Sequence, residues 1–151
     1  MIFYRHADPR YPFLWETADQ PAARWHGNGD GPVHYLADTT DGAWAEFLRH
    51  EAITEVEDLA GVECSLWTVD VPDEMETDIA KVDFPGCRGG LDSYPLCRQV
   101  ADDVRSEGRA GLIAPSAALV EGAAHGWHVD DGLQEGPSRD GRVLVLFGRR
   151  A

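Results

Sequence analysis

Apolar residues recur along the chain with two different spacings. Short apolar or alternating runs predict β-strands, and apolar residues three and four positions apart predict helices. The predicted strands cover residues 2–4, 33–37, 63–71, 111–114 and 142–147. The predicted helices run from caps at residues 39–41 to about residue 50, from a cap at Ser93 to about residue 107, and over residues 117–124, with one or two further helical turns within 53–59. The last strand, RVLVLF, is apolar enough to be central in a sheet.

The segments between these elements carry turn and loop chemistry. Residues 8–21 contain three prolines and predict an irregular, partly packed loop. Residues 26–32, HGNGDGP, predict tight turns, because glycine and asparagine accept positive φ at little cost. Residues 73–90 predict a long surface connection, and residues 125–140, rich in glycine and acid, predict a solvated loop. No repeat or linker interrupts the pattern, so we expect residues 1–151 to form a single domain.

The helix predicted to end near His50 has one polar pair at the border of its apolar side. Glu46 and His50 are four residues apart, so they lie together along one edge of the helix. That border is where a residue lining a cleft would sit, held by packing yet reachable from solvent. A solvated Glu–His pair is the structural alternative. The apolar stripe beside the pair consists of Ala43, Trp44, Phe47 and Leu48.

The charge balance narrows the classes of partner. The chain has 27 acidic and 13 basic residues, for a net charge of −14. This surplus repels a phosphate backbone and argues against nonspecific binding of nucleic acid. No apolar run approaches the roughly 18 residues that a membrane span needs, and the N-terminus lacks the pattern of a secretory signal. We therefore expect a cytoplasmic protein with no direct nucleic-acid or membrane partner.

The cysteines and histidines do not predict a metal site. Cys64, Cys87 and Cys97 are odd in number and widely spaced, so we expect reduced, partly buried thiols. His125 and His128, with two aspartates beside them, could be read as metal ligands. The glycine-rich surroundings and the lack of a matching cysteine pair favour a solvated loop instead.

Residues 23–51 carry three side chains suited to a dinucleotide. Arg24 and Tyr35 lie eleven residues apart, as do Tyr35 and Glu46. A cation can bind phosphates, a ring face can stack on a base, and a carboxylate can hold ribose hydroxyls. This combination leads to the hypothesis of a dinucleotide site, although a tyrosine on a strand is more often a core residue.

A series of short motifs in a fixed order resembles the RES domain family. The motifs are Tyr4-Arg5, Arg24-Trp25, a strand bearing Tyr35, AxxE at residues 43–46, and G-hydrophobic-x-x-PS-A at residues 111–117. The family is named for an arginine, a glutamate and a serine, which by this resemblance would be Arg24, Glu46 and Ser116. The resemblance covers about residues 2–148.

The chain departs from the family pattern in two places. Two alanines at residues 22–23 replace the paired glycines that often precede the arginine, and His26 replaces an asparagine. The segment between Ser116 and the last strand is also long, and it adds Glu121, His125, Trp127 and His128.

The resemblance implies both a fold and a function. The implied fold is a compact α/β domain of mixed α+β type, with a central mixed sheet and flanking helices, distantly similar to ADP-ribosyltransferases. Members are typically toxins of bacterial toxin–antitoxin pairs and degrade NAD, some by phosphorolysis. The implied partner is an Xre-type antitoxin with a Cro-repressor-like DNA-binding region. NAD would be a substrate, inorganic phosphate a co-substrate, and no other cofactor is expected.

Combined with the chemistry of NAD cleavage, the resemblance suggests a role for each candidate residue. Glu46 would stabilise positive charge at the anomeric carbon of the ribose, and His50 would orient Glu46. Arg24 and Arg5 would bind the pyrophosphate. Tyr35 would stack on nicotinamide.

Ser116 would bind a phosphate or position the attacking group, and it could also cap a helix. Three functions remain open: an NAD phosphorylase or glycohydrolase, an ADP-ribosyltransferase acting on a protein, and an inactive nucleotide- or protein-binding module. Whether copies of the chain assemble is also open.

Overall fold

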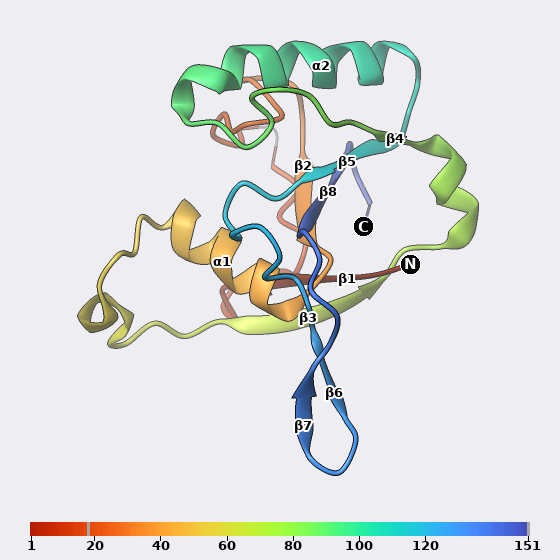
Figure 1. The fold of residues 1–151 in the computed structure, drawn as a ribbon. Helices are drawn as coiled ribbons and strands as arrows, with labels where there is room; N and C mark the ends of the chain where they lie inside the picture. The colour runs from red at the N-terminus through yellow and green to blue at the C-terminus, as the bar shows by residue number, and fades with distance from the viewer. Residues whose placement is uncertain (18, 151) are drawn as a thin grey trace.

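A six-stranded mixed sheet forms the centre of the protein (Figure 1). The computed structural model describes residues 1–17 and 19–150. The strand order is β3-β1-β2-β8-β5-β4, and neighbouring strands are antiparallel except for the parallel pair β4–β5. The strands are β1 Ile2–Ala7, β2 Val33–Ala37, β3 Ser65–Asp70, β4 Ile79–Lys81, β5 Gly111–Pro115 and β8 Arg142–Phe147. The predicted central position of the last strand is therefore confirmed.

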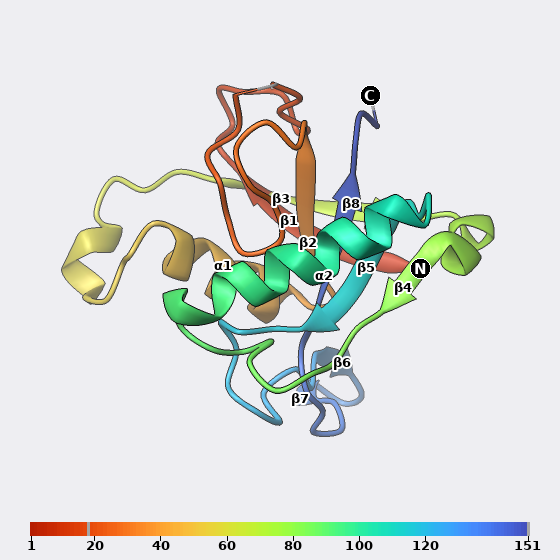
Figure 2. The ribbon, with the colours of Figure 1, turned by 90° about the horizontal axis from the view of Figure 1, so that it is seen from above.

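Two α-helices pack on the same face of this sheet. They are α1 Thr40–His50 and α2 Tyr94–Ser106, and three 3-10 helices accompany them: η1 Val56–Leu59, η2 Asp73–Asp78 and η3 Leu91–Ser93. Figure 2, seen from the side of α2, shows this helix lying across the sheet. The first helix begins where predicted, because the Thr39 hydroxyl accepts a hydrogen bond from Gly42 N at 2.9 Å.

Strand alternation divides the core between the two faces of the sheet. On the α1/α2 face, Val143, Val145 and Phe147 of β8 pack with Leu112 and Ala114 of β5. On the opposite face, Leu144 and Leu146 pack with Phe3, Leu36 and Ile113. Because successive residues of a strand point to opposite faces, every site residue on a strand is assigned to one face by its position.

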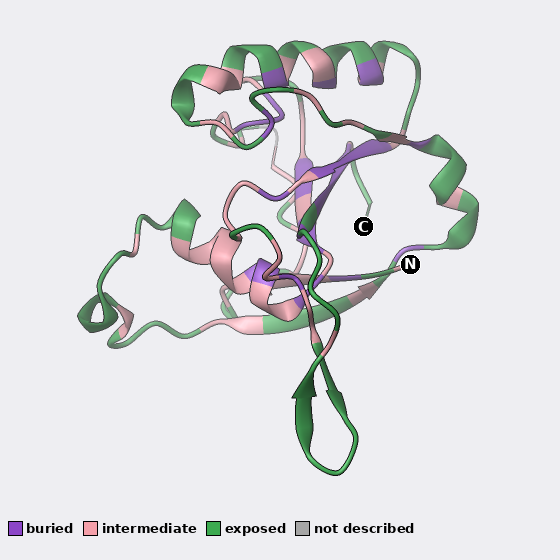
Figure 3. Cartoon of the chain, in the orientation of Figure 1, coloured by how far each residue is buried: buried purple, intermediate pink, exposed green. Residues whose placement is uncertain are grey.

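A two-stranded hairpin projects from the body of the protein (Figure 1). It consists of β6 Trp127–Val129 and β7 Leu133–Glu135, and Figure 3 shows it as fully exposed. The predicted loop at residues 125–140 therefore contains regular structure. The connecting turn consists of residues 130–132, and its last two residues, Asp131 and Gly132, both have positive φ.

Two further predictions differ from the structure. The helix predicted over residues 117–124 is wrong: the segment forms bends and a turn. At its end Ala124 N donates to Arg139 O, so the backbone there pairs with a distant segment and not with a preceding helical turn. The surface connection predicted over residues 73–90 contains η2 and β4. The three residues of β4 are too few for a pattern of alternation, and pairing with β5 makes them a strand.

The predictions of the fold class and of the cysteines are confirmed. The sheet, its flanking helices and the mixed α+β class agree with the sequence analysis. The cysteines are free thiols: Cys87 and Cys97 are buried, and Cys64 is half-buried. None of the helices in residues 1–17 and 19–150 has the length and apolar character needed to cross a membrane.

Candidate active site

A carboxylate and a hydroxyl from distant parts of the chain meet beside α1. The Ser116 hydroxyl donates a hydrogen bond to Glu46 Oε1 at 2.8 Å, across a sequence separation of 70 residues. Glu46 lies in the middle of α1, and Ser116 follows the last residue of β5. Ser116 is buried, whereas Glu46 is half-buried. Within the described residues Glu46 Oε2 has no hydrogen-bond partner, so one oxygen of the carboxylate is available to a ligand.

The backbone around Ser116 fixes the direction of its hydroxyl proton. Ser116 Oγ accepts N–H groups from Ala118 and Leu119 at 3.2 and 3.3 Å. Ser116 N donates to Gly141 O at 2.8 Å. A side chain at Gly141 would lie only 3.3 Å from Ser116 Cβ, so glycine permits this close approach. With its lone pairs engaged by two N–H groups, the hydroxyl directs its proton to the carboxylate.

Arg24 is buried, and its terminal nitrogens bind a loop of the protein. Nη1 donates to Cys87 O and to the Ser93 hydroxyl, each at 3.0 Å, and Nη2 donates to Gly89 O at 2.7 Å. The guanidinium also lies over the Tyr94 ring, 4.7 Å from its centroid. Arg24 therefore holds the loop of residues 86–90 against the start of α2.

Ser93 does not cap α2 with its side chain, contrary to the sequence prediction. Its hydroxyl donates to Gly90 O at 2.7 Å and accepts from Arg24, so it is engaged by the neighbouring loop instead. Gly89 is needed in this arrangement, because a Cβ there would lie 2.9 Å from the Ser93 side chain.

Tyr35 and His26 form a buried chain of hydrogen bonds. The Tyr35 hydroxyl accepts from Trp25 N at 3.2 Å and lies 2.9 Å from His26 Nδ1, while His26 Nε2 lies 2.9 Å from Pro21 O. A carbonyl can only accept, so the proton is on Nε2 and Nδ1 accepts from Tyr35. Burial lowers the pKa of His26 and raises the pKa of Tyr35, which keeps both groups neutral. The histidine that departs from the family pattern thus has a structural role.

The structure does not bring Arg5 or His50 to the Glu46–Ser116 pair. Arg5 lies two residues after Phe3 on β1, so it faces the side of the sheet opposite α1 and α2. Burial lowers its pKa, and its Nη1 has no hydrogen-bond partner among the described residues. The His50 side chain is 80% exposed, and its Nε2 lies 3.9 Å from Glu51 Oε1. The expected contact with Glu46 is therefore replaced by one with Glu51.

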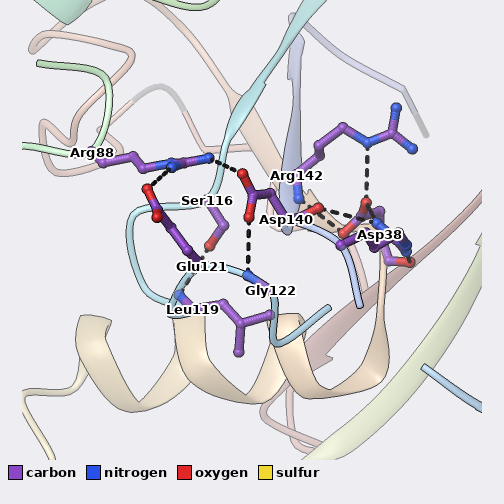
Figure 4. Close-up of polar contacts among 9 residues, drawn as sticks. Asp38, Arg88, Ser116, Leu119, Glu121, Gly122, Asp140 and Arg142 are labelled. Atoms are coloured by element: carbon purple, nitrogen blue, oxygen red, sulfur yellow. Dashed lines mark hydrogen bonds and ion pairs between the residues drawn. The ribbon is translucent and has the colours of Figure 1, made fainter. Parts of the chain in front are cut away.

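A cation that the sequence analysis missed binds two carboxylates of the segment that follows Ser116. Arg88 donates to Glu121 Oε1 at 2.8 Å and to Asp140 Oδ2 at 3.0 Å. Figure 4 shows Arg88 pointing toward both carboxylates, with Ser116 between it and α1 in this view. Asp140 also accepts Gly122 N at 2.9 Å. Hydrogen bonds from Gly122 and then from Arg88 lower the pKa of Asp140, so this carboxylate is charged at neutral pH. The available signal was an arginine in the glycine-rich sequence CRGG.

Two pockets lie on the opposite face of the sheet. One, of about 260 Å³, is lined by residues that include Phe3, Asp38 and Ile113. The other, of about 290 Å³, is lined by residues that include His34, Leu36 and Leu146. These linings belong to the face opposite α1 and α2. The Glu46–Ser116 pair is thus recognised by its chemistry and not by an enclosed cavity.

No group of three histidine, cysteine or acidic side chains gathers to hold a metal ion within residues 1–17 and 19–150. His125 Nδ1 lies 2.8 Å from Gly126 O, and the ring packs edge-on against Trp127. Of the two histidines, His125 precedes the exposed hairpin, and His128 lies within its strand β6, opposite Gln134.

Comparison with protein-family models gives a match. A family model described as the RES domain matches residues 2–129, which include β1 to β6 and therefore both Glu46 and Ser116. No curated protein matches the chain.

Proposed function

Because the chain belongs to the RES domain family, we propose that it is an enzyme that consumes NAD by cleaving the nicotinamide–ribose bond. Inorganic phosphate is the proposed acceptor, which makes the enzyme an NAD phosphorylase; water would make it a glycohydrolase. The observation that carries the proposal is the 2.8 Å hydrogen bond between Ser116 Oγ and Glu46 Oε1. It joins the glutamate and the serine of the family pattern and leaves Glu46 Oε2 available.

Cleavage of this bond requires a negative charge near the ribose, and it does not require a general acid for the leaving group. Cleavage passes through an oxocarbenium-like state, and nicotinamide leaves as a neutral molecule, so no proton has to be donated to it. A carboxylate near the ribose stabilises the positive charge that develops at the anomeric carbon. Glu46 Oε2 would supply this charge, while Oε1 is held by Ser116.

The first role of Ser116 would be to position the Glu46 carboxylate. Its hydroxyl orients the Glu46 carboxylate, and a bound phosphate could share the same donor during attack on the ribose. Arg24 would support the site indirectly, since its hydrogen bonds hold the loop of residues 86–90. Contact of Arg5, Tyr35 or His50 with NAD stays a prediction from the family resemblance.

The proposal is tested by incubating the purified protein with NAD, with and without inorganic phosphate, and identifying the products. We expect nicotinamide release that rises and saturates with phosphate, and ADP-ribose 1″-phosphate as the second product. A Glu46→Gln preparation, purified in parallel, controls for contaminating activity. Free ADP-ribose at every phosphate level would make the enzyme a hydrolase. ADP-ribose attached to a protein would support the transferase alternative, and unchanged NAD would refute the proposal.

We also propose that the chain is the toxin of a bacterial toxin–antitoxin pair and acts in the cytoplasm on the cellular NAD pool. The support is family membership. Induced expression in a bacterium should stop growth and deplete NAD, whereas Glu46→Gln at equal protein level should do neither. Growth arrest that persists with the Glu46→Gln protein would show that NAD cleavage is not its cause.

A further inference from the structure

The Arg88 guanidinium is bound by two separate carboxylates, each through one of its terminal nitrogens. Nη1 binds Glu121 at 2.8 Å and Nη2 binds Asp140 at 3.0 Å. Both carboxylates are well solvated, with 80% of the Glu121 side chain and 52% of the Asp140 side chain exposed. Ion pairs between solvated groups are weak, so a competing anion can exchange with them.

Two series of contacts connect the surroundings of Arg88 with the Glu46–Ser116 pair. Asp140 precedes Gly141, whose carbonyl accepts the Ser116 N–H at 2.8 Å. On the other side, Gly89 O is approached by Arg49 Nη2 of α1 at 3.5 Å, one turn of helix after Glu46. Figure 4 shows the Arg88 side chain pointing toward Glu121 and Asp140, with Ser116 drawn below it in this view.

Arg24 fixes the backbone on both sides of Arg88. Its hydrogen bonds go to Cys87 O and Gly89 O, the carbonyls of the residues before and after Arg88. Arg24 has its terminal nitrogens engaged in the interior, while the Arg88 side chain is 35% exposed and, within residues 1–17 and 19–150, is bound by two solvated carboxylates. Of these two guanidinium groups, Arg88 is the one that can receive an anion without breaking buried hydrogen bonds.

We propose that Arg88 binds the phosphate group of the substrate beside Ser116, with Glu121 and Asp140 occupying the guanidinium until the phosphate arrives. This inference rests on the proposed function for the identity of the substrate. A phosphate group offers two oxygens to the fork of one guanidinium, which matches its geometry better than two separate carboxylates do. Glu121 is the more exposed of the two carboxylates, and it leaves first.

The phosphate group has two possible sources: the pyrophosphate of NAD and the inorganic phosphate acceptor. Two measurements separate them. The KM for NAD is determined without inorganic phosphate, and the half-saturating phosphate concentration is determined at saturating NAD. A change in the first assigns Arg88 to the dinucleotide, and a change in the second assigns it to the acceptor.

A binding experiment tests the site without any turnover. Calorimetric titration with inorganic pyrophosphate and with inorganic phosphate compares wild type with Arg88→Gln, Arg88→Lys and Glu121→Gln. We expect Arg88→Gln to weaken binding about tenfold to a hundredfold, as loss of hydrogen bonds to a charged group implies. Arg88→Lys should lie between wild type and Arg88→Gln, because it keeps the charge and loses the fork. Glu121→Gln should strengthen binding.

Arg109→Gln is a matched control, because the Arg109 side chain is similarly exposed, at 41%, and also binds a carboxylate, that of Glu107. Its other contact is the backbone carbonyl of Thr77, away from the site. This variant should leave both affinities unchanged. Thermal unfolding of each variant checks the fold, and Arg88→Lys keeps the test valid if Arg88→Gln proves unstable.

The outcomes distinguish this inference from the proposed function. Equal anion affinity in wild type, Arg88→Gln and Arg88→Lys would overturn the inference, even if wild type cleaves NAD. Absence of anion binding by wild type would overturn it as well. Loss of anion binding in Arg88→Gln would support it, even if NAD were not cleaved and the proposed function failed.

Discussion

Replacing Glu46 with glutamine separates the charge of this side chain from its shape. Glutamine is nearly isosteric, and its side-chain oxygen can still accept the hydrogen bond from Ser116 that Glu46 Oε1 accepts at 2.8 Å. The position is half-buried at the edge of α1, so the helix stripe is unaffected. The loss in folding stability should therefore be about 1 kcal/mol or less, the difference between a charged and a neutral acceptor.

The effect on catalysis should be much larger than the effect on stability. Loss of one group that stabilises a charged transition state commonly costs about a hundredfold or more in kcat, which corresponds to about 2.7 kcal/mol. Nicotinamide release measured by chromatography at saturating NAD gives kcat, and thermal unfolding gives stability. The control is Glu51→Gln, which removes an exposed carboxylate just after the same helix. A kcat for Glu46→Gln within about threefold of wild type would refute the role assigned to this carboxylate.

Three further predictions concern Ser116, Arg24 and three histidines whose pKa values are lowered by burial. Ser116→Ala should weaken the phosphate dependence of turnover more than it weakens nicotinamide release without phosphate; equal loss in both would refute a role at the acceptor. Arg24→Lys should lower the free energy of unfolding in urea by about 1–3 kcal/mol, because a lysine cannot satisfy the same buried carbonyls. If Arg24→Lys leaves the stability unchanged and raises the KM for NAD, Arg24 binds the pyrophosphate, as the sequence analysis expected. Burial lowers the pKa values of His6, His26 and His34 in the folded state, so the unfolded state binds more protons below about pH 6.5. The free energy of unfolding should therefore be highest above that pH and should fall as the pH is lowered toward 5.5. A free energy of unfolding that stays constant over this range would contradict the lowered histidine pKa values.

Several local elements of this protein were determined by the sequence. Strand β2 has the bounds that the apolar run predicted, and α1 starts at the expected threonine cap and ends at the expected histidine. Both signals act between residues a few positions apart: alternation along a strand and a hydroxyl that accepts an N–H three residues ahead. Glu46 and Ser116 were also identified from sequence, although only the family resemblance placed them in one site.

The partners of each polar group were decided by the tertiary structure. Arg24 was expected at a phosphate, but its partners lie 63 to 69 residues away in a loop that closes over it. Arg88 went unnoticed because its carboxylates are 33 and 52 residues further along the chain. Arg5 was separated from Glu46 by strand alternation, since an odd or even position on β1 decides the face. Short-range patterns are set by neighbours in the sequence, whereas the partner of a charged side chain depends on which distant segments the packed sheet brings together.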